Sequence, residues 1–241
     1  MTRLSVNVNK FALLRNSRDT DYPNLETMAR RAIAAGVHGI TVHPRPDQRH
    51  IRYSDVPVLG ALTAKHDGVE FNIEGNPTPE FLDLVEQARP DQATLVPDDP
   101  GQLTSDHGWN MDSSVESLGP VVDRLKNAGI RVSLFMDPST EWIDRVPDVG
   151  ADRIELYTEP YARAFGTSEA GTTWDRFRAA ADHARSIGLG VNAGHDLNLD
   201  NLGRFLEIEG VLEVSIGHAI VVESFDYGFE GTLERYLKLV G

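Results

Sequence analysis

Short apolar segments alternate with helix-length segments along the whole chain. The apolar segments are bounded by turn residues, and they predict strands at 4–8, 39–43, 69–74, 92–96, 131–136, 153–157, 190–193 and 212–216. Amphipathic patterns between them predict helices, among them 24–35, 55–65, 78–87, 115–128, 140–146, 173–187, 198–207 and 229–240. Eight strands that alternate with helices indicate an α/β fold with a parallel sheet.

One local pattern recurs where a helix meets the next strand. A glycine followed by an apolar residue stands in Ala35-Gly36-Val37, Ala128-Gly129-Ile130, Val149-Gly150-Ala151 and Ile187-Gly188-Leu189. Glycine there takes the left-handed conformation that closes a helix, so the pattern indicates a repeated αβ unit. Such units form a (β/α)8 TIM barrel or a doubly wound sheet. Because no Gly-x-Gly-x-x-Gly follows the first strand, and no linker interrupts the chain, we predict a single-domain barrel over residues 1–241.

Composition narrows the range of partners. The formal net charge of −14 argues against affinity for nucleic acid or for an anionic membrane, because both need a basic surface. The chain has no cysteine, which excludes disulfides and thiol chemistry. No apolar run approaches the roughly 20 residues of a membrane span, and residues 1–9 do not form a signal peptide. We therefore expect a soluble, cytoplasmic protein.

Two strands near the carboxyl terminus end in the same dipeptide. Val191-Asn192-Ala193-Gly194-His195 and Val214-Ser215-Ile216-Gly217-His218 each run from apolar residues into Gly-His. A helix-length segment separates them, so both dipeptides emerge at one edge of a parallel sheet. In a barrel this edge carries the active site, and phosphate often binds after the seventh and eighth strands. Backbone N–H groups at glycines and at a following helix start would attract an anion.

Polar residues gather at the other predicted strand ends as well. They are Asn7, Asn9, Lys10, His43, Arg45, Glu74, Thr104, Glu155, Tyr157, His195, Gly217 and His218, with Arg15, Arg18, Gln48, Arg49 and His50 in adjoining loops. Histidine and a shielded carboxyl both exchange protons near neutral pH, and arginine binds phosphate. This set indicates proton transfer on a small phosphorylated carbonyl compound. Arg15 and Arg49 could equally be solvated loop residues.

A metal site uses the same residue types. However, the first strand has no His-x-His, the chain has no His-Glu-x-x-His, and the candidates are dispersed singly over many strands. We therefore predict no metal, with a metal hydrolase as the outside alternative.

Several stretches resemble the pyridoxine 5′-phosphate synthase family of vitamin B6 biosynthesis. The most specific are Thr41-Val42-His43-Pro44-Arg45 with Arg49-His50 downstream, and the two Gly-His strands. The resemblance covers almost the whole chain. It implies a (β/α)8 barrel, commonly an octamer, that uses no cofactor. It also implies a transferase that condenses 3-amino-2-oxopropyl phosphate with 1-deoxy-D-xylulose 5-phosphate and releases phosphate and water.

The same resemblance implies roles for individual residues. His43 and Glu74 match the proton acceptors of the family and His195 its proton donor. Residues matched to substrate or phosphate contacts are Asn7, Asn9, Lys10, Arg18, Arg45, His50, Thr104, Gly217 and His218. Glu155 and Asp196 join this predicted binding site as strand-end neighbours.

Some of these positions depart from the family pattern. Asn9-Lys10 stands where the family has Asp-His, Asp196 replaces a glycine, Tyr157 replaces a histidine, and Glu223 replaces an arginine. An acid at 223 would repel an anion if it pointed inward. Two alternatives therefore accompany the synthase reaction: a paralogue that condenses a different phosphorylated carbonyl compound, and a non-catalytic phosphate-ligand binding barrel.

Overall fold

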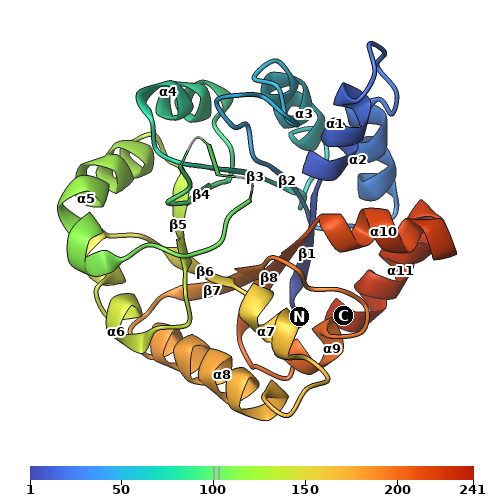
Figure 1. Ribbon diagram of the computed structural model, residues 1–241. Coiled ribbons are helices and arrows are strands. Elements are labelled where there is room, and N and C mark those ends of the chain that lie inside the picture. Colours follow the sequence, from blue (N-terminus) through green and yellow to red (C-terminus); the bar gives the residue numbers. More distant parts are fainter. Residues whose placement is uncertain (100, 103) are drawn as a thin grey trace.

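Eight parallel strands close into a barrel in the computed structural model, which describes residues 1–99, 101–102 and 104–241 (Figure 1). Each strand pairs with the next in sequence, and β8 pairs with β1. The strands are β1 (Arg3–Asn7), β2 (Gly39–Val42), β3 (Glu70–Gly75), β4 (Gln92–Leu95), β5 (Arg131–Met136), β6 (Arg153–Tyr157), β7 (Gly190–Gly194) and β8 (Val211–Ile216). The predicted (β/α)8 barrel is confirmed, and every predicted strand boundary lies within one residue of the observed one.

Helices form a ring around the barrel (Figure 1). They are α1 (Asn9–Asn16), α2 (Leu25–Ala34), α3 (Asp55–Thr63), α4 (Pro79–Ala88), α5 (Met111–Asn127), α6 (Thr140–Ile143), the 3-10 helix η1 (Val146–Val149), α7 (Glu159–Ala164), α8 (Ala170–Ser186), α9 (Leu202–Phe205), α10 (His218–Tyr227) and α11 (Phe229–Val240). Along the described part of the chain, none of them is long and apolar enough to cross a bilayer.

Helix prediction failed where polar side chains bond to the local backbone. The predicted helix 198–207 shortens to α9, because Asn198 Oδ1 accepts hydrogen bonds from the backbone N–H groups of Asp200 and Asn201. Asn201 Oδ1 in turn accepts from the N–H of Asn198 at 2.9 Å. These bonds hold a turn where the helix was expected. The segments α1, α7 and α10 were not predicted, and all three begin within two residues of a strand end.

The glycine joints between helices and strands are confirmed. Gly36, Gly129, Gly150 and Gly188 have φ angles of 98°, 80°, 76° and 88°. A side chain is strained in this region, which explains why glycine recurs at each joint.

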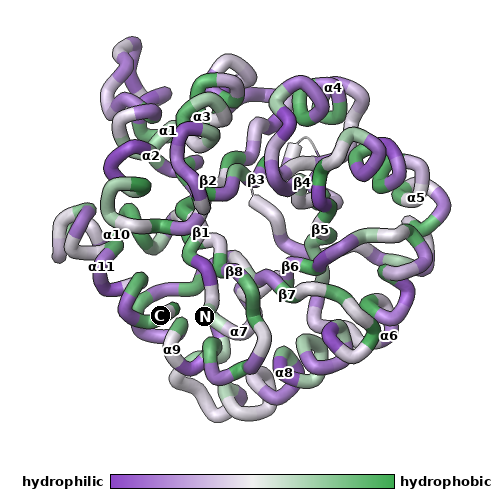
Figure 2. Tube along the Cα trace, turned by 180° about the vertical axis from the view of Figure 1, so that it is seen from behind, coloured by the Kyte–Doolittle hydropathy of each residue, from purple (hydrophilic) through white to green (hydrophobic). Residues whose placement is uncertain are grey.

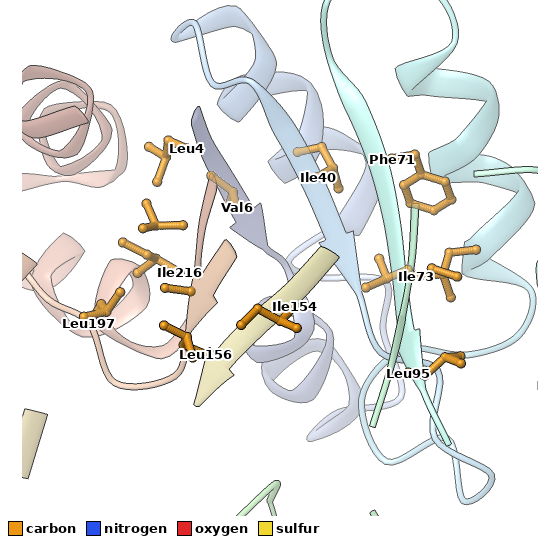
Figure 3. Packing of buried hydrophobic residues seen from close by; sticks show 14 of the residues in the cluster. Leu4, Val6, Ile40, Phe71, Ile73, Leu95, Ile154, Leu156, Leu197 and Ile216 are labelled. Carbon is orange, nitrogen blue, oxygen red and sulfur yellow. The ribbon is translucent and has the colours of Figure 1, made fainter. Parts of the chain in front are cut away.

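The hydrophobic core lies between the strands and the helices. Outward-facing residues of successive strands, including Leu4, Val6, Ile40 and Ile73, are fully buried and belong to one continuous cluster (Figure 3). The surrounding helices change repeatedly between hydrophobic and hydrophilic residues along their length (Figure 2). This is the amphipathic pattern of helices that cover a barrel.

The inside of the barrel, in contrast, is polar. Ser5 on β1 contacts Thr41 on β2 at 2.7 Å, and Thr94 on β4 donates a hydrogen bond to Asn72 on β3 at 3.1 Å. Asn192 on β7 reaches across to Gln92 on β4 at 3.3 Å. Apolar branched side chains usually fill the interior of such barrels. Here hydrogen-bonded polar side chains fill the interior up to the carboxyl ends of the strands, which form the rim of the barrel. Such an interior can hold charged groups near the barrel axis.

Candidate active site

Closure of the parallel barrel brings predicted site residues together at one rim. Glu74 lies near the end of β3, and Glu155 lies in the middle of β6. His43, His195 and Gly217 directly follow β2, β7 and β8. Carboxyl ends of all strands meet at the same end of a barrel, which is where barrel enzymes place their active sites.

Glu74 is an unusually weak acid. Its Oε2 accepts a hydrogen bond from Asn7 Nδ2 at 3.2 Å, and the Ser215 side chain provides a second hydrogen bond. Burial, followed by the charges of Asp98 and Glu213, raises the pKa of the Glu74 carboxyl to about 8. A carboxyl with this pKa can both accept and return a proton near neutral pH.

Glu155 lies deeper, against the backbone of the first Gly-His strand. The residue is only 3% exposed, and its Oε2 has no hydrogen-bond partner among the described residues. Burial raises the pKa of Glu155 well above its ordinary value, and the nearby Glu74 and Glu213 raise it further. A Cβ atom at Gly194 would lie 2.3 Å from Glu155 Oε1. Gly194 therefore makes room for a protonated carboxylic acid.

His195 is held at the rim by an unusual backbone. His195 and Asp196 have φ angles of 87° and 61°, a region that non-glycine residues seldom adopt. Its Nε2 lies 3.1 Å from Thr104 Oγ1, whereas its Nδ1 lies 3.6 Å from Asp196 Oδ2 and has no hydrogen-bond partner in the described structure. Such strained residues cluster at functional sites. The positive φ also explains why a glycine would fit at position 196.

Aromatic and apolar side chains pack beside His195, starting from the end of the neighbouring strand β6. Tyr157 contacts the His195 ring edge to face at a centroid distance of 5.2 Å, and it packs with Val96 and Phe135. Burial, Glu159 and Asp196 raise the pKa of Tyr157 to about 12. The Tyr157 hydroxyl is thus uncharged at neutral pH. The histidine expected at this position from the family pattern would instead have added a group that titrates near pH 7.

His43 and His50 form a neutral pair after β2. Their ring centroids are 6.0 Å apart. Burial, Arg45 and His50 hold the pKa of His43 well below its usual range, and burial, Arg45 and Lys10 lower the pKa of His50 to about 4. Both rings are therefore uncharged at pH 7, the form that accepts a proton.

Arg45 is buried in an ion pair that was not predicted. The guanidinium binds the Asp98 carboxylate and donates a second hydrogen bond to the Gln102 carbonyl at 2.8 Å. These two contacts tie the loop after β2 to the loop after β4, within which Asp98 also accepts a hydrogen bond from Ser105 Oγ at 2.8 Å. Asp98 was missed, although its position three residues after a strand end was a visible signal.

Asn9 and Lys10 have different roles. Asn9 Oδ1 accepts the backbone N–H of His43 at 2.9 Å, so Asn9 joins the ends of β1 and β2. An aspartate would accept the same bond, and this departure therefore preserves the contact. Lys10 is exposed in the first turn of α1, and its ammonium makes no hydrogen bond or ion pair within the described residues.

The three arginines predicted in loops near the site, Arg15, Arg18 and Arg49, differ in their contacts. Arg15 is buried and binds Asp55 through two hydrogen bonds of 2.8 and 2.9 Å, which joins α1 to α3. It is a structural residue and not a solvated one. Arg49 binds Asp47 at 2.6 Å. Arg18 is exposed on the turn after α1, and its guanidinium contacts no other charged group in the described part of the chain.

The second Gly-His strand leads directly into α10. Gly217 precedes the helix, and His218 is its first residue and is exposed. A Cβ atom at Gly217 would lie 2.9 Å from the Asn7 carbonyl, so glycine allows the ends of β8 and β1 to approach closely. The helix begins at the rim, where its free N–H groups attract anions.

Glu223 does not point toward this anion site. Its Oε1 accepts the backbone N–H of Leu199 at 3.0 Å, and its Oε2 accepts the Tyr236 hydroxyl at 2.5 Å. The carboxylate thus joins α10 to the loop after β7 and to α11. The repulsion considered from the sequence does not arise, because this acid is used in packing.

The barrel, its buried carboxyls and neutral histidines, and the helix start at the rim are the features of a (β/α)8 barrel with a candidate acid–base site. Among the described residues, no three His, Asp or Glu side chains form a group that could hold a metal ion.

Comparison with known proteins identifies the family. Residues 4–241 match the model of the pyridoxal phosphate biosynthesis protein PdxJ, and the chain belongs to this family. It is 52% identical to the pyridoxine 5′-phosphate synthase of Xanthomonas axonopodis pv. citri, over 99% of this chain and 96% of that protein. It is 50% identical to the synthase of Brucella abortus, over 98% and 97%.

Distant structures share the fold. A 3-hexulose-6-phosphate synthase superposes with a TM-score of 0.67 at 12% identity, over the full length of both chains. The likeness extends to the barrel architecture alone.

Proposed function

We propose that the protein is a pyridoxine 5′-phosphate synthase. It condenses 3-amino-2-oxopropyl phosphate with 1-deoxy-D-xylulose 5-phosphate, closes the pyridine ring, and releases inorganic phosphate and water. Family membership and the names of relatives with about 50% identity support this reaction. The structural observation that carries it is the placement of weakly acidic carboxyls and neutral histidines around one rim.

Ring closure requires repeated proton transfer. The amine of one substrate attacks the ketone of the other, and the hydroxyl that leaves must be protonated to depart as water. We assign the donation of that proton to His195, and the 3.1 Å contact of its Nε2 with Thr104 Oγ1 supports this role. Carbon–hydrogen bonds next to the new imine must then lose protons, and Glu74 and the neutral His43 are the acceptors. The raised pKa of Glu74 lets it take up a proton in one step and return it in another.

Phosphate groups bind where backbone donors and cations meet. The start of α10, with Gly217 and His218, holds one phosphate. Asn7, which already donates to Glu74, places the aminoketone phosphate beside the proton acceptor. Lys10 and His50 contact the second substrate on the β2 side of the rim.

Four further predicted residues differ in the support they have. For substrate binding, Arg45 can use only the guanidinium N–H groups that are not already bonded to Asp98 and Gln102. Thr104 orients His195, and Asp196 adjoins it. Arg18 has the weakest support, because it is exposed outside the rim.

A changed second substrate is the competing function, and Lys10 is the observation that favours it. Its unpaired ammonium stands near the rim where a histidine would be expected, so it offers a charge that a different anionic group could use. This paralogue would bind one phosphorylated substrate and make no pyridoxine 5′-phosphate.

Complementation separates the two functions. A bacterial strain unable to make vitamin B6 should grow without pyridoxine when it expresses this protein, and should not grow when it expresses Glu74→Gln at the same level. Failure of the wild-type protein to restore growth, although it is folded and abundant, would favour the paralogue.

We also propose that the enzyme is cytoplasmic and forms a homo-oligomer, which is commonly an octamer in this family. Light scattering during size-exclusion chromatography measures the assembly directly, and a monomer at micromolar concentration would contradict it.

A further inference from the structure

A third carboxyl lies inside the barrel below the rim, and the proposed reaction does not use it. Glu213, in β8, is 2% exposed. Its Oε1 has no hydrogen-bond partner within the described residues. Buried polar atoms are usually paired, so a carboxylate oxygen left without a partner calls for an explanation other than packing.

The strand register places Glu213 one layer beneath the proton-transfer groups. Glu213 is in register with Arg3 on β1 and with Asn192 on β7, and Asn192 is in register with Glu155 on β6. Ser215, two residues further along β8, faces the same lumen and hydrogen-bonds to Glu74. Residues two apart in a strand are separated by about 7 Å, so the Glu213 charge acts on Glu74 at short range.

Below Glu213, the foot of the lumen is rich in arginine. Arg3 and Arg131 both bind Glu70, which connects β1, β3 and β5 across the barrel. Arg153 donates to Asn192 Oδ1 at 3.3 Å. Two guanidinium groups therefore share one carboxylate at this level, and the third, on Arg153, adds positive charge that favours an ionised Glu213.

Glu213 is a stronger acid than Glu74, which lies above it. Burial and Glu70 raise the pKa of Glu213 to about 7, while Arg153, Arg131 and Arg3 counteract this rise. The pKa of Glu74 is about 8, and burial raises that of Glu155 well above its ordinary value. Glu213 thus ionises before Glu74, and its charge opposes ionisation of both Glu74 and Glu155.

We propose that Glu213 is a positioning residue of this active site: its carboxylate, stabilised by arginines at the foot of the lumen, strengthens the proton affinity of Glu74 and Glu155, so that these carboxyls exchange protons with substrate near neutral pH. This inference rests on the proposed function, because it assigns Glu74 to proton transfer. The charged groups that face Glu213 are Arg3, Glu70, Glu74, Arg131, Arg153 and Glu155.

The test follows the Glu74 carboxyl by infrared spectroscopy across a pH titration, without substrate. The difference between wild type and Glu74→Gln identifies the carbonyl band of protonated Glu74. In Glu213→Gln the midpoint of that band should fall by about one pH unit, because a negative charge near Glu74 has been removed. Glu213→Asp retains the charge and should titrate nearly as the wild type. Glu209→Gln makes the same charge change on an exposed turn and should leave the midpoint unchanged.

A folded Glu213→Gln with an unchanged Glu74 midpoint would overturn the inference. If that variant does not fold, Glu213→Met removes the charge at similar volume, and the same shift is expected. In turnover assays, the acidic limb of the plot of kcat against pH should move to lower pH in Glu213→Gln, while KM stays constant. If the role of Glu213 were purely structural, the substitution would change thermal stability and leave this pH dependence unchanged. If no pyridoxine 5′-phosphate forms but the infrared midpoint shifts, the electrostatic coupling stands and the proposed reaction fails.

Discussion

Gly194 and Glu155 depend on each other, because a Cβ atom at residue 194 would lie 2.3 Å from Glu155 Oε1. The glycine of the first Gly-His pair is thus required by a buried acid on the neighbouring strand. The glycine of the second pair serves a close approach to Asn7. The same dipeptide therefore meets two different packing demands.

Gly194→Ala should displace the Glu155 carboxyl. We expect a loss of about 1–3 kcal/mol in the free energy of unfolding, and a fall in kcat of about 100-fold from misplacement near the reacting groups. Urea unfolding and steady-state kinetics measure both effects. Gly171→Ala is the matched control, since a Cβ atom there meets nothing within 4 Å at the start of α8. Equal behaviour of the two variants would contradict this role for Gly194.

The raised pKa of Glu74 makes stability depend on pH. Between its unfolded value near 4.5 and its folded value of about 8, the folded protein holds a proton that the unfolded chain has released. Stability from this group is therefore greatest at low pH and is lost as the pH rises, by up to about 1.4 kcal/mol per pH unit. Glu74→Gln cannot ionise, so its stability relative to wild type should increase from pH 5 to pH 8. Urea titrations at each pH would refute this if the difference stayed constant.

Removing Asp98 should leave Arg45 buried without its counter-charge. For Asp98→Ala we expect a loss of about 3–5 kcal/mol in the free energy of unfolding. Asp112→Ala serves as the control, because the ion pair of Asp112 with Arg145 is exposed and contributes about 0–1 kcal/mol. Similar losses in the two variants would show that the Arg45–Asp98 pair is not specially buried.

Asp196 and Lys10 should affect phosphate binding in opposite directions. Interaction with the His195 side chain lowers the pKa of Asp196, so the carboxylate is ionised at neutral pH. Asp196→Asn removes this negative charge, and asparagine tolerates the positive φ, so KM for the phosphorylated substrates should fall about two- to fivefold. Lys10→Gln should raise KM by a similar factor. Changes of the same sign in both variants would argue against a shared electrostatic origin.

The fold was predictable because local signals agreed with one another. Apolar strand segments and glycines with positive φ at four helix–strand joints define the repeated unit, and the structure retains them. The polar lumen was also visible in the alternation of Arg3-Leu4-Ser5-Val6-Asn7 and Glu70-Phe71-Asn72-Ile73-Glu74, although it was not interpreted. Strict alternation in a parallel strand indicates that the inner face is polar.

The side-chain partners at the rim could not be read from the sequence. That Arg45 binds Asp98, or that Glu223 turns toward Leu199 and Tyr236, depends on how separate loops pack. Glu213 was overlooked for a related reason. It lies inside β8, whereas the candidate residues were sought at the carboxyl ends of the strands. Only closure of the barrel brings it beneath Glu74.

The central claim is tested most directly by product analysis with purified protein. The enzyme is incubated with 3-amino-2-oxopropyl phosphate and 1-deoxy-D-xylulose 5-phosphate, and pyridoxine 5′-phosphate is measured by mass spectrometry together with released phosphate. We predict both products in equal amounts with the wild type, and neither with His195→Ala or Glu74→Gln. Release of phosphate without pyridoxine 5′-phosphate, or no reaction from folded wild-type protein, would contradict the assignment.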